Sequence, residues 1–173
     1  MSSIKARFSK IKAVVLDVDG VLTDGSIVVT TAGEEHRIMN TKDGYALNHA
    51  ALQQFPVWVI SGGLSEGVGI RLRRLGLTEV HLGIKNKLVL LGQLMAQYGF
   101  KAEELLYMGD DLPDYACMKL CGISACPQDA APEIRELADY VVPVDGGKGC
   151  VRHLLREVLL MQEKWFQSNA TSA

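Results

Sequence analysis

Short, uninterrupted apolar runs alternate with longer segments of helical spacing along almost the whole chain, and this alternation constrains the fold most. The apolar runs are expected to be strands, at residues 11–16, 57–60, 80–82, 105–108 and 122–125. A strand that is apolar at every position is typical of a parallel sheet covered on both faces. Helical spacing marks residues 44–53, 64–75, 86–98, 112–120, 132–137 and 148–164. Strands that alternate with helices predict an α/β fold, a doubly wound, mainly parallel sheet of Rossmann type.

One segment departs from this pattern. Residues 26–40 contain two short β runs around a glycine turn, which predicts a β-hairpin that projects from the sheet. The 173 residues contain no linker or repeat, so residues 1–166 are expected to form a single domain. Residues 167–173 are small and polar and are expected to form a flexible tail.

Composition excludes several classes of protein. Apolar residues make up 48% and charged residues 22% of the chain, which is typical of a globular protein. A formal net charge of −2 argues against a nucleic-acid partner. No apolar run approaches the roughly 18–20 residues of a membrane span, and residues 1–10 have positive charges but no apolar stretch, so a secretory signal is not expected. The four cysteines fit no metal-ligand spacing and are expected to be buried, reduced thiols of a cytoplasmic protein.

Polar residues follow four of the predicted strands. Asp17 and Asp19 follow the first, Ser61 the second, Lys87 the third, and an acidic segment from Asp110 the fourth. Because open α/β sheets bind ligands at the carboxyl ends of their strands, these side chains are expected to lie together. Asp17, Asp19, Asp110 and Asp111 would then repel one another unless a hard cation such as Mg²⁺ neutralised them. Each aspartate alone is equally explained as a helix cap or turn former.

A lysine and a serine complete this set. Lys87 begins a predicted helix, where a cation opposes the helix dipole, so an anionic partner such as phosphate explains it better than a solvated surface does. Ser61 opens another helix, where a hydroxyl and free N–H groups can hold phosphate oxygens or form an ordinary cap.

Four motifs in order, Asp17-Val-Asp19-Gly-Val-Leu-Thr-Asp24, Ser61, Lys87 and Gly109-Asp-Asp-Leu-Pro-Asp114, resemble those of the haloacid dehalogenase superfamily. The resemblance extends over residues 11–165. Within the superfamily, the chain is similar to the small 3-deoxy-D-manno-octulosonate 8-phosphate (KDO-8-phosphate) phosphatases, which have no cap domain. The hairpin, residues 40–44, Arg71 and residues 146–149 also match.

The resemblance implies a Mg²⁺-dependent phosphoric monoester hydrolase. Asp17 would attack phosphorus to give an aspartyl-phosphate, and Asp19 would act as general acid and base. Asp17, the main-chain carbonyl of Asp19, and Asp110 would bind Mg²⁺. Ser61 and Lys87 would stabilise the phosphate oxygens. Asp111 and Asp114 would support these ligands or orient Lys87.

The resemblance also implies substrate contacts and an assembly. The implied contact residues are Asp19, Asn40, Thr41, Lys42, Asp43, Gly44, Asn48, Gly62, Gly63, Arg71 and Lys87. Arg71 suits the carboxylate of a sugar acid, although it also fits a solvated helix face. Many relatives carry Thr-Gly-Arg where this chain has Ser61-Gly62-Gly63, so one anion contact is missing. The implied assembly is a homotetramer in which hairpins pack together, and the implied pathway is lipopolysaccharide biosynthesis.

Three alternatives remain open. The substrate is KDO-8-phosphate or another sugar-acid phosphate, such as a 2-keto-3-deoxy-nonulosonate 9-phosphate. A phospho-receiver signalling domain has a similar sheet, but its acceptor aspartate follows the third strand, where this chain has Lys85 and Lys87. A non-catalytic interaction module of the same fold is disfavoured by the complete set of acids with Ser61 and Lys87.

Overall fold

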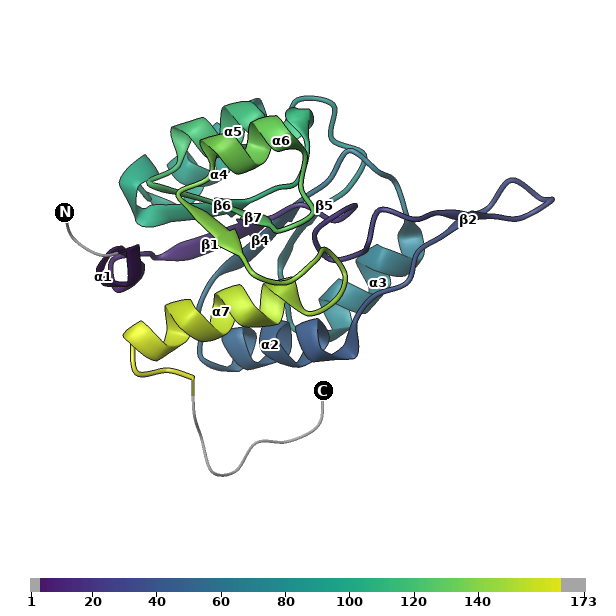
Figure 1. Cartoon of the computed structure of the whole chain (residues 1–173). Helices are drawn as coiled ribbons and strands as arrows, with labels where there is room; N and C mark the ends of the chain where they lie inside the picture. Colours follow the sequence, from purple (N-terminus) through teal and green to yellow (C-terminus); the bar gives the residue numbers. More distant parts are fainter. Residues whose placement is uncertain (1–3, 166–173) are drawn as a thin grey trace.

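A computed structural model describes residues 4–165, which fold around a six-stranded parallel sheet (Figure 1). The strands lie in the order β5-β4-β1-β6-β7-β8. Their bounds are β1 Ala13–Leu16, β4 Val57–Ile60, β5 Glu79–His81, β6 Leu105–Met108, β7 Ile123–Pro127 and β8 Tyr140–Val142. The expected doubly wound α/β fold is therefore confirmed.

The central strand β1 sets the position of the site. Val14 of β1 is in register with Val57 of β4 on one side and with Leu106 of β6 on the other. The three strands run in the same direction, so their carboxyl ends lie side by side. The residues that follow them, Asp17, Ser61 and Gly109, therefore emerge at one edge of the sheet.

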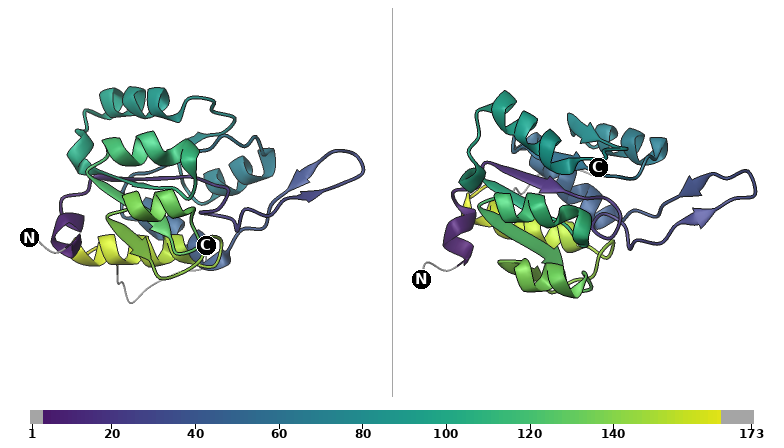
Figure 2. Two further views of the ribbon diagram at one scale, coloured as in Figure 1. Left: turned by 45° about the horizontal axis from the view of Figure 1, so that its top comes forward. Right: turned by 90° about the horizontal axis from the view of Figure 1, so that it is seen from above.

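Helices cover both faces of the sheet, as Figures 1 and 2 show. One face carries α1 (Ile4–Phe8), α2 (Thr41–Leu52), α3 (Glu66–Arg74) and α7 (Cys150–Met161). The other carries α4 (Lys87–Tyr98), α5 (Tyr115–Leu120) and α6 (Pro132–Leu137). All four residues of β1 are buried, and they alternate between the two resulting cores, which explains the uninterrupted apolar run.

The predicted hairpin is present and projects far from the sheet (Figure 2). Its strands, β2 (Val28–Val29) and β3 (Glu35–His36), pair antiparallel. Each has only two residues, and all four are exposed. Among the described residues, the segment between β1 and α2 holds this hairpin and no cap domain.

Several elements differ from the sequence prediction. β8 and α1 were not predicted, because β8 has three residues at the sheet edge and α1 has only one buried side chain, Phe8. The helix α2 begins at Thr41 rather than at residue 44, because Asn40 caps it by accepting from the Lys42 N–H at 2.8 Å. Pro113 begins a separate 3₁₀ turn, η2 (Leu112–Asp114), before α5. A second 3₁₀ turn, η1, spans Ala102–Glu104.

Two expectations from composition are met within the described residues. No helix there has both the length and the hydropathy that crossing a membrane requires. All four cysteines are buried and free. The predicted tail at residues 167–173 lies outside the described part of the chain.

Candidate active site

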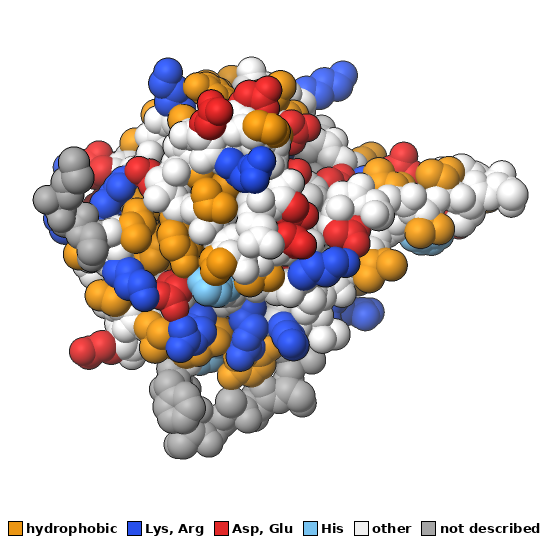
Figure 3. All heavy atoms as spheres, viewed as in Figure 1, with side chains coloured by type: hydrophobic (Ala, Val, Ile, Leu, Met, Phe, Trp, Pro, Cys, Tyr) orange, Lys and Arg blue, Asp and Glu red, His pale blue; other side chains and the backbone are white. Residues whose placement is uncertain are grey.

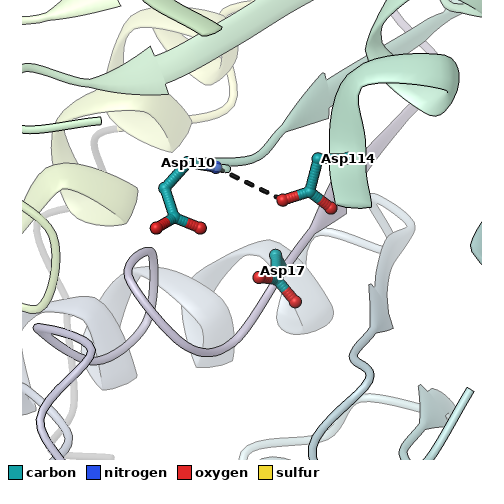
Figure 4. Close-up of side chains that lie close together, drawn as sticks. All are labelled: Asp17, Asp110 and Asp114. Carbon is teal, nitrogen blue, oxygen red and sulfur yellow. Dashed lines mark hydrogen bonds between the residues drawn. The ribbon is translucent and has the colours of Figure 1, made fainter. Parts of the chain in front are cut away.

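Three carboxylates meet at the carboxyl edge of the sheet (Figure 4). Asp17 follows β1, Asp110 follows β6, and Asp114 ends η2. One oxygen from each lies within 4.8 Å of the others. Two glycines allow this approach: a Cβ at Gly20, where φ is +86°, would collide with the Asp110 carboxylate, and a Cβ at Gly109 would collide with Asp114.

A buried ammonium group binds two of these acids. Lys87 is the first residue of α4, and its Nζ lies 2.8 Å from Asp17 Oδ1 and 2.8 Å from Asp114 Oδ1. Its side chain is only 7% exposed, so the contacts compensate a charge that would otherwise be costly to bury. Lys87 therefore has an anionic partner, as its place at a helix N-terminus predicted.

Asp114 differs from the other two acids because its hydrogen-bonding capacity is used within the protein. Its Oδ1 accepts from Lys87 Nζ and, at 2.7 Å, from the hydroxyl of Tyr107. Its Oδ2 accepts from the Asp110 N–H at 3.3 Å. Asp114 thus orients Lys87 and supports Asp110, whereas Asp17 and Asp110 keep oxygens for a ligand.

The electrostatics of the cluster leave negative charge uncompensated. Burial, followed by the charge of Asp114, raises the pKa of Asp17 despite the opposing effect of Lys87. Burial and the neighbouring Asp17 and Asp114 raise the pKa of Asp110 to about 7. Burial opposes the charge of Lys87, but Asp17 and Asp114 outweigh that effect and raise its pKa. One ammonium cannot neutralise three carboxylates, and their oxygens are the ligands that a hard divalent cation prefers.

Two of the four aspartates predicted to converge, Asp19 and Asp111, do not join the cluster. Asp111 is exposed, and its Oδ1 accepts from the Leu112 N–H at 2.8 Å, so it caps η2. Asp111 still lines the same open hollow as Asp17 and Asp110, but one of its carboxylate oxygens caps η2.

The acids line an open hollow of about 330 Å³, which we call the acidic hollow. Its lining residues are Asp17, Asp19, Gly25, Ser61, Gly62, Gly63, Lys87, Asp110, Asp111, Pro113 and Asp114. Ser61 is 2% exposed, and its Oγ accepts from the Gly63 N–H at 3.1 Å. The predicted serine and glycines therefore lie beside the predicted acids and lysine, with room for a phosphate-sized group.

Asp19 has a partner that the sequence did not suggest. Arg37, directly after β3 of the hairpin, donates from Nε to Asp19 Oδ1 at 2.7 Å and from Nη2 to Asp19 Oδ2 at 3.0 Å. These hydrogen bonds raise the pKa of Arg37. No spacing rule connects a hairpin arginine with Asp19, so sequence periodicity could not have found the pair.

A second hollow, of about 910 Å³, lies between the hairpin and α3, and we call it the hairpin groove. Its lining includes Arg37, Met39, Leu64 and Arg71. Arg71 also lies against Gly44, where a Cβ would approach its Nη2 to 2.8 Å. Arg71 and Gly44, both predicted to contact substrate, are thus neighbours.

Three other predicted contact residues each make a hydrogen bond within the fold. Asn40 caps α2 and also donates to the Gly147 carbonyl at 3.2 Å. Asp43 is 1% exposed and accepts from the Arg152 N–H of α7 at 2.6 Å. Asn48 donates at 3.2 Å to the carbonyl of Leu75, the C-cap of α3. None of the three lines either hollow, because each terminates or tethers a helix instead.

The remaining predicted contacts, Thr41 and Lys42, are exposed in the first turn of α2. The glycines at residues 146–149 line neither hollow, and two of them pack against the turn that follows Asp19. A Cβ at Gly146 would collide with the Gly20 carbonyl, and the Gly147 N–H donates to the Val21 carbonyl at 3.0 Å. The last loop of the fold is thus packed against the turn that follows Asp19.

Comparisons with known proteins agree with this geometry. A profile of haloacid dehalogenase-like hydrolases matches residues 77–154. The chain is 35% identical over 171 residues to the 3-deoxy-D-manno-octulosonate 8-phosphate phosphatase KdsC of Escherichia coli (strain B / BL21-DE3), a match that covers 99% of this chain and 91% of that protein.

Solved structures are similar over the same extent. The 3-deoxy-D-manno-octulosonate 8-phosphate phosphatase from Yersinia pestis superposes with a TM-score of 0.93 at 33% identity, covering 99% of this chain and 92% of that chain. The corresponding Moraxella catarrhalis phosphatase, solved with magnesium ion, phosphate ion and KDO, superposes with a TM-score of 0.91 at 29% identity, covering 95% of each chain.

Proposed function

We propose a function from the family to which the chain belongs, the haloacid dehalogenase-like hydrolases in their group of KDO-8-phosphate phosphatases. The proposed reaction is the hydrolysis of KDO-8-phosphate to KDO and inorganic phosphate. The observation that carries the proposal is the buried Lys87, which bridges Asp17 and Asp114 with Asp110 beside them. A buried cation and two carboxylates with free oxygens, facing an open hollow, suit the binding and transfer of a phosphoryl group.

Asp17 and Asp19 divide the chemistry between them. Asp17 attacks phosphorus opposite the leaving oxygen, forming an aspartyl-phosphate as the bond from phosphorus to the sugar oxygen breaks. Asp19 protonates that oxygen, because a sugar alkoxide is a poor leaving group. Asp19 then takes a proton from water, whose oxygen attacks phosphorus and breaks the bond to Asp17. Inorganic phosphate leaves, and both carboxyl groups return to their starting state.

The donor set fits Mg²⁺. Asp17 and Asp110, with the main-chain carbonyl of Asp19, would hold the ion, which when bound neutralises charge on the transferring phosphoryl group. Lys87 and Ser61 stabilise the same phosphate oxygens, since both line the acidic hollow. Asp114 keeps Lys87 in place through their 2.8 Å contact.

The hairpin supports a proposal about assembly. Ile27, Val28, Val29 and Ile38 are 42%, 56%, 65% and 75% exposed, and Figure 3 shows hydrophobic side chains along the projection. A two-stranded hairpin is marginal in water, and exposed apolar surface of this kind favours a protein partner. We propose a homotetramer in which hairpins pack together and neighbouring chains complete the mouth of the site.

We further propose that residues 1–166 form one domain and that the enzyme serves lipopolysaccharide biosynthesis in the cytoplasm.

Phosphate release tests the activity. The protein is assayed on KDO-8-phosphate, on a nine-carbon 2-keto-3-deoxy sugar-acid 9-phosphate and on a generic phosphate ester, each with Mg²⁺ and with EDTA. The expected result is release from KDO-8-phosphate that is preferred and lost in EDTA. Preference for the nine-carbon substrate would keep the mechanism and change the substrate, and release from none of the three would contradict the proposal.

The nucleophile is tested by Asp17→Asn, which keeps the shape of the side chain but removes the attacking carboxylate. The expected loss in kcat is about 10⁴-fold or more, the scale seen when a covalent nucleophile is removed. Activity close to that of the parent would contradict the aspartyl-phosphate. Trapping of the phosphoenzyme by rapid acid quench should succeed with the parent and fail with the variant.

A further inference from the structure

Arg37 occupies the boundary between the two hollows. It lines the hairpin groove, while its partner Asp19 lines the acidic hollow. Although β2 and β3 are fully exposed, the side chain of Arg37 is only 3% exposed. Its second acidic neighbour, Glu35, contributes only a long contact, at 3.4 Å from Nη2. The hairpin thus delivers one buried guanidinium to the edge of the catalytic centre.

One nitrogen of this guanidinium has no partner. Nε and Nη2 of Arg37 donate to Asp19, but Nη1 is buried and makes no hydrogen bond within the described part of the chain. A buried, unpaired donor on a charged group is costly, so it indicates a site where an acceptor is to be supplied. For a guanidinium, the matching acceptor is a carboxylate or a phosphate.

Gly63 gives the guanidinium its space. A Cβ at position 63 would lie 2.8 Å from Asp19 Oδ2 and 3.0 Å from Arg37 Nη2. Any side chain there would therefore displace the Arg37–Asp19 pair. Arg37 reaches this space from the hairpin, directly after β3.

The chemistry of the proposed substrate decides between the two anions. In KDO-8-phosphate the phosphate and the carboxylate stand at opposite ends of an eight-carbon chain. With the phosphate between Asp17, Lys87 and Ser61, the carboxylate extends beyond the acidic hollow. The hairpin groove is the neighbouring hollow, and Arg37 lies at its junction with the catalytic centre.

We propose that Arg37 determines specificity by binding the carboxylate of the sugar acid, and that until this carboxylate arrives it holds Asp19 in a closed pair. The inference rests on the proposed function. Both oxygens of Asp19 accept from Arg37, so Asp19 takes up a proton from solvent and reaches the leaving oxygen only after the pair opens. A substrate carboxylate replaces one acidic partner of Arg37 with another, whereas a neutral sugar offers no such exchange. Substrate identity thereby controls access to the general acid.

The test compares two primary phosphate esters that differ in the carboxylate: KDO-8-phosphate and the neutral aldose phosphate D-arabinose 5-phosphate. Arg37→Gln is expected to lower kcat/KM for KDO-8-phosphate about 10- to 100-fold, mainly through KM. For D-arabinose 5-phosphate, kcat/KM should stay within about threefold or rise, because Asp19 is no longer held. Equal losses on both esters would overturn the inference, because they would show that Arg37 only positions Asp19.

Matched variants keep the test decisive. Arg74→Gln removes an exposed arginine of α3 that lines neither hollow. It should leave kcat/KM for both substrates unchanged. Arg71→Gln removes the second arginine of the hairpin groove. A selective loss there, with none in Arg37→Gln, would assign the carboxylate to Arg71 and overturn the inference. If Arg37→Gln does not fold by circular dichroism, Arg37→Lys, which keeps the charge without the fork, should give a smaller selective loss.

The two proposals fail in different ways. A parent enzyme that releases no phosphate from KDO-8-phosphate contradicts the proposed function. A parent that does so, with Arg37→Gln equally impaired on both esters, contradicts only the role of Arg37. A direct measurement uses KDO itself, which carries the carboxylate without the phosphate: calorimetric titration should show weaker binding to Arg37→Gln than to the parent.

Discussion

The acidic cluster and the hairpin are opposite kinds of structure. Asp17 is 6% exposed and follows β1, which is paired on both sides, and Asp114 is 1% exposed and ends the 3₁₀ turn η2. The hairpin has two-residue strands, and Val29 and Ile38 are 65% and 75% exposed. The cluster is completed within one chain, whereas the hairpin leaves apolar surface that one chain does not cover.

This contrast separates the residues proposed for phosphoryl transfer from those proposed for substrate choice and assembly. Parallel strands fix the positions of Asp17, Lys87 and Asp110, the residues proposed as nucleophile, phosphate-binding cation and metal ligand. The hairpin carries Arg37 to the site and presents its apolar side chains outward. Substrate choice and assembly are therefore expected to respond to changes in the hairpin that leave the phosphoryl-transfer chemistry intact.

Two neighbouring aspartates give the largest expected effect. Asp110 belongs to the cluster and Asp111 caps η2 at the surface. Asp110→Asn should lower kcat/KM by at least about 100-fold and weaken Mg²⁺ binding, because a charged ligand is lost. Asp111→Asn should cost less than about threefold, since asparagine also caps helices. Steady-state kinetics across a Mg²⁺ titration measure both, and similar losses in the two variants would remove the distinction.

The hairpin is tested by a charge on its exposed apolar surface. Val29→Asp should dissociate the proposed homotetramer, because a carboxylate would then be buried between hairpins, and should raise KM about tenfold. Val89→Asp is the matched control, since Val89 of α4 is also exposed, at 55%, but lies away from the hairpin. Light scattering at micromolar concentration reports the assembly. A parent protein that is monomeric there would contradict the assembly itself.

The cluster should make the stability depend on pH in a way that Mg²⁺ reverses. Asp110 has its pKa raised to about 7, and burial raises the pKa of Asp17 to about 6. A raised acid pKa in the folded state favours folding below about pH 4, and this contribution is lost as the pH rises through 6 and 7. In EDTA the Tm should therefore fall over this range.

Mg²⁺ competes with protons for the same oxygens, so its effect should grow over the same range. At an Mg²⁺ concentration of 100 times Kd, the expected stabilisation is about 2.7 kcal/mol at neutral pH and smaller at pH 5. Scanning calorimetry at four pH values with Mg²⁺ or EDTA measures both trends. A Tm in EDTA that rises from pH 5 to 7 would show that ionisation of the clustered carboxyl groups does not destabilise the fold.

The smallest expected effect separates fold from function on α2. Asn48 donates to the carbonyl of Leu75 and lines neither hollow. Asn48→Ala should lower the free energy of unfolding by about 1 kcal/mol, the usual contribution of one hydrogen bond, with kcat/KM within about threefold. Urea denaturation and kinetics are compared. A large rise in KM at unchanged stability would return Asn48 to the substrate contacts that the sequence predicted.

The sequence predicted the cluster well because a parallel sheet converts sequence order into spatial proximity. Once β1 and β6 are recognised as neighbours, Asp17 and Asp110 must meet, and Lys87 follows at the start of α4. The direction of an individual side chain was harder to predict. Asp111 adjoins Asp110 but caps η2 instead of joining the cluster, whereas Asp114, at the end of η2, does join it.

The hairpin and its contacts were beyond sequence reasoning for a physical reason. Its strands are too short for periodicity to place Arg37, and the Arg37–Asp19 pair depends on how the hairpin leaves the sheet. Likewise, Asp43 lies in a motif that predicts a substrate contact. Its burial against Arg152 of α7 depends on packing between helices that are distant in the sequence. Tertiary packing, not local pattern, decides which polar side chains remain available.

The contact between Gly146 and Gly20 has a consequence for the order of events during synthesis. The turn after Asp19 is made early, but the loop that it packs against precedes the last helix of the fold. A contact between the two ends of the chain closes late, because its loop entropy must be overcome first. A nascent chain on the ribosome therefore carries all its acids and its lysine before it has a working centre. The site is complete only after residues 146–149 have been made and have packed against the turn at Gly20.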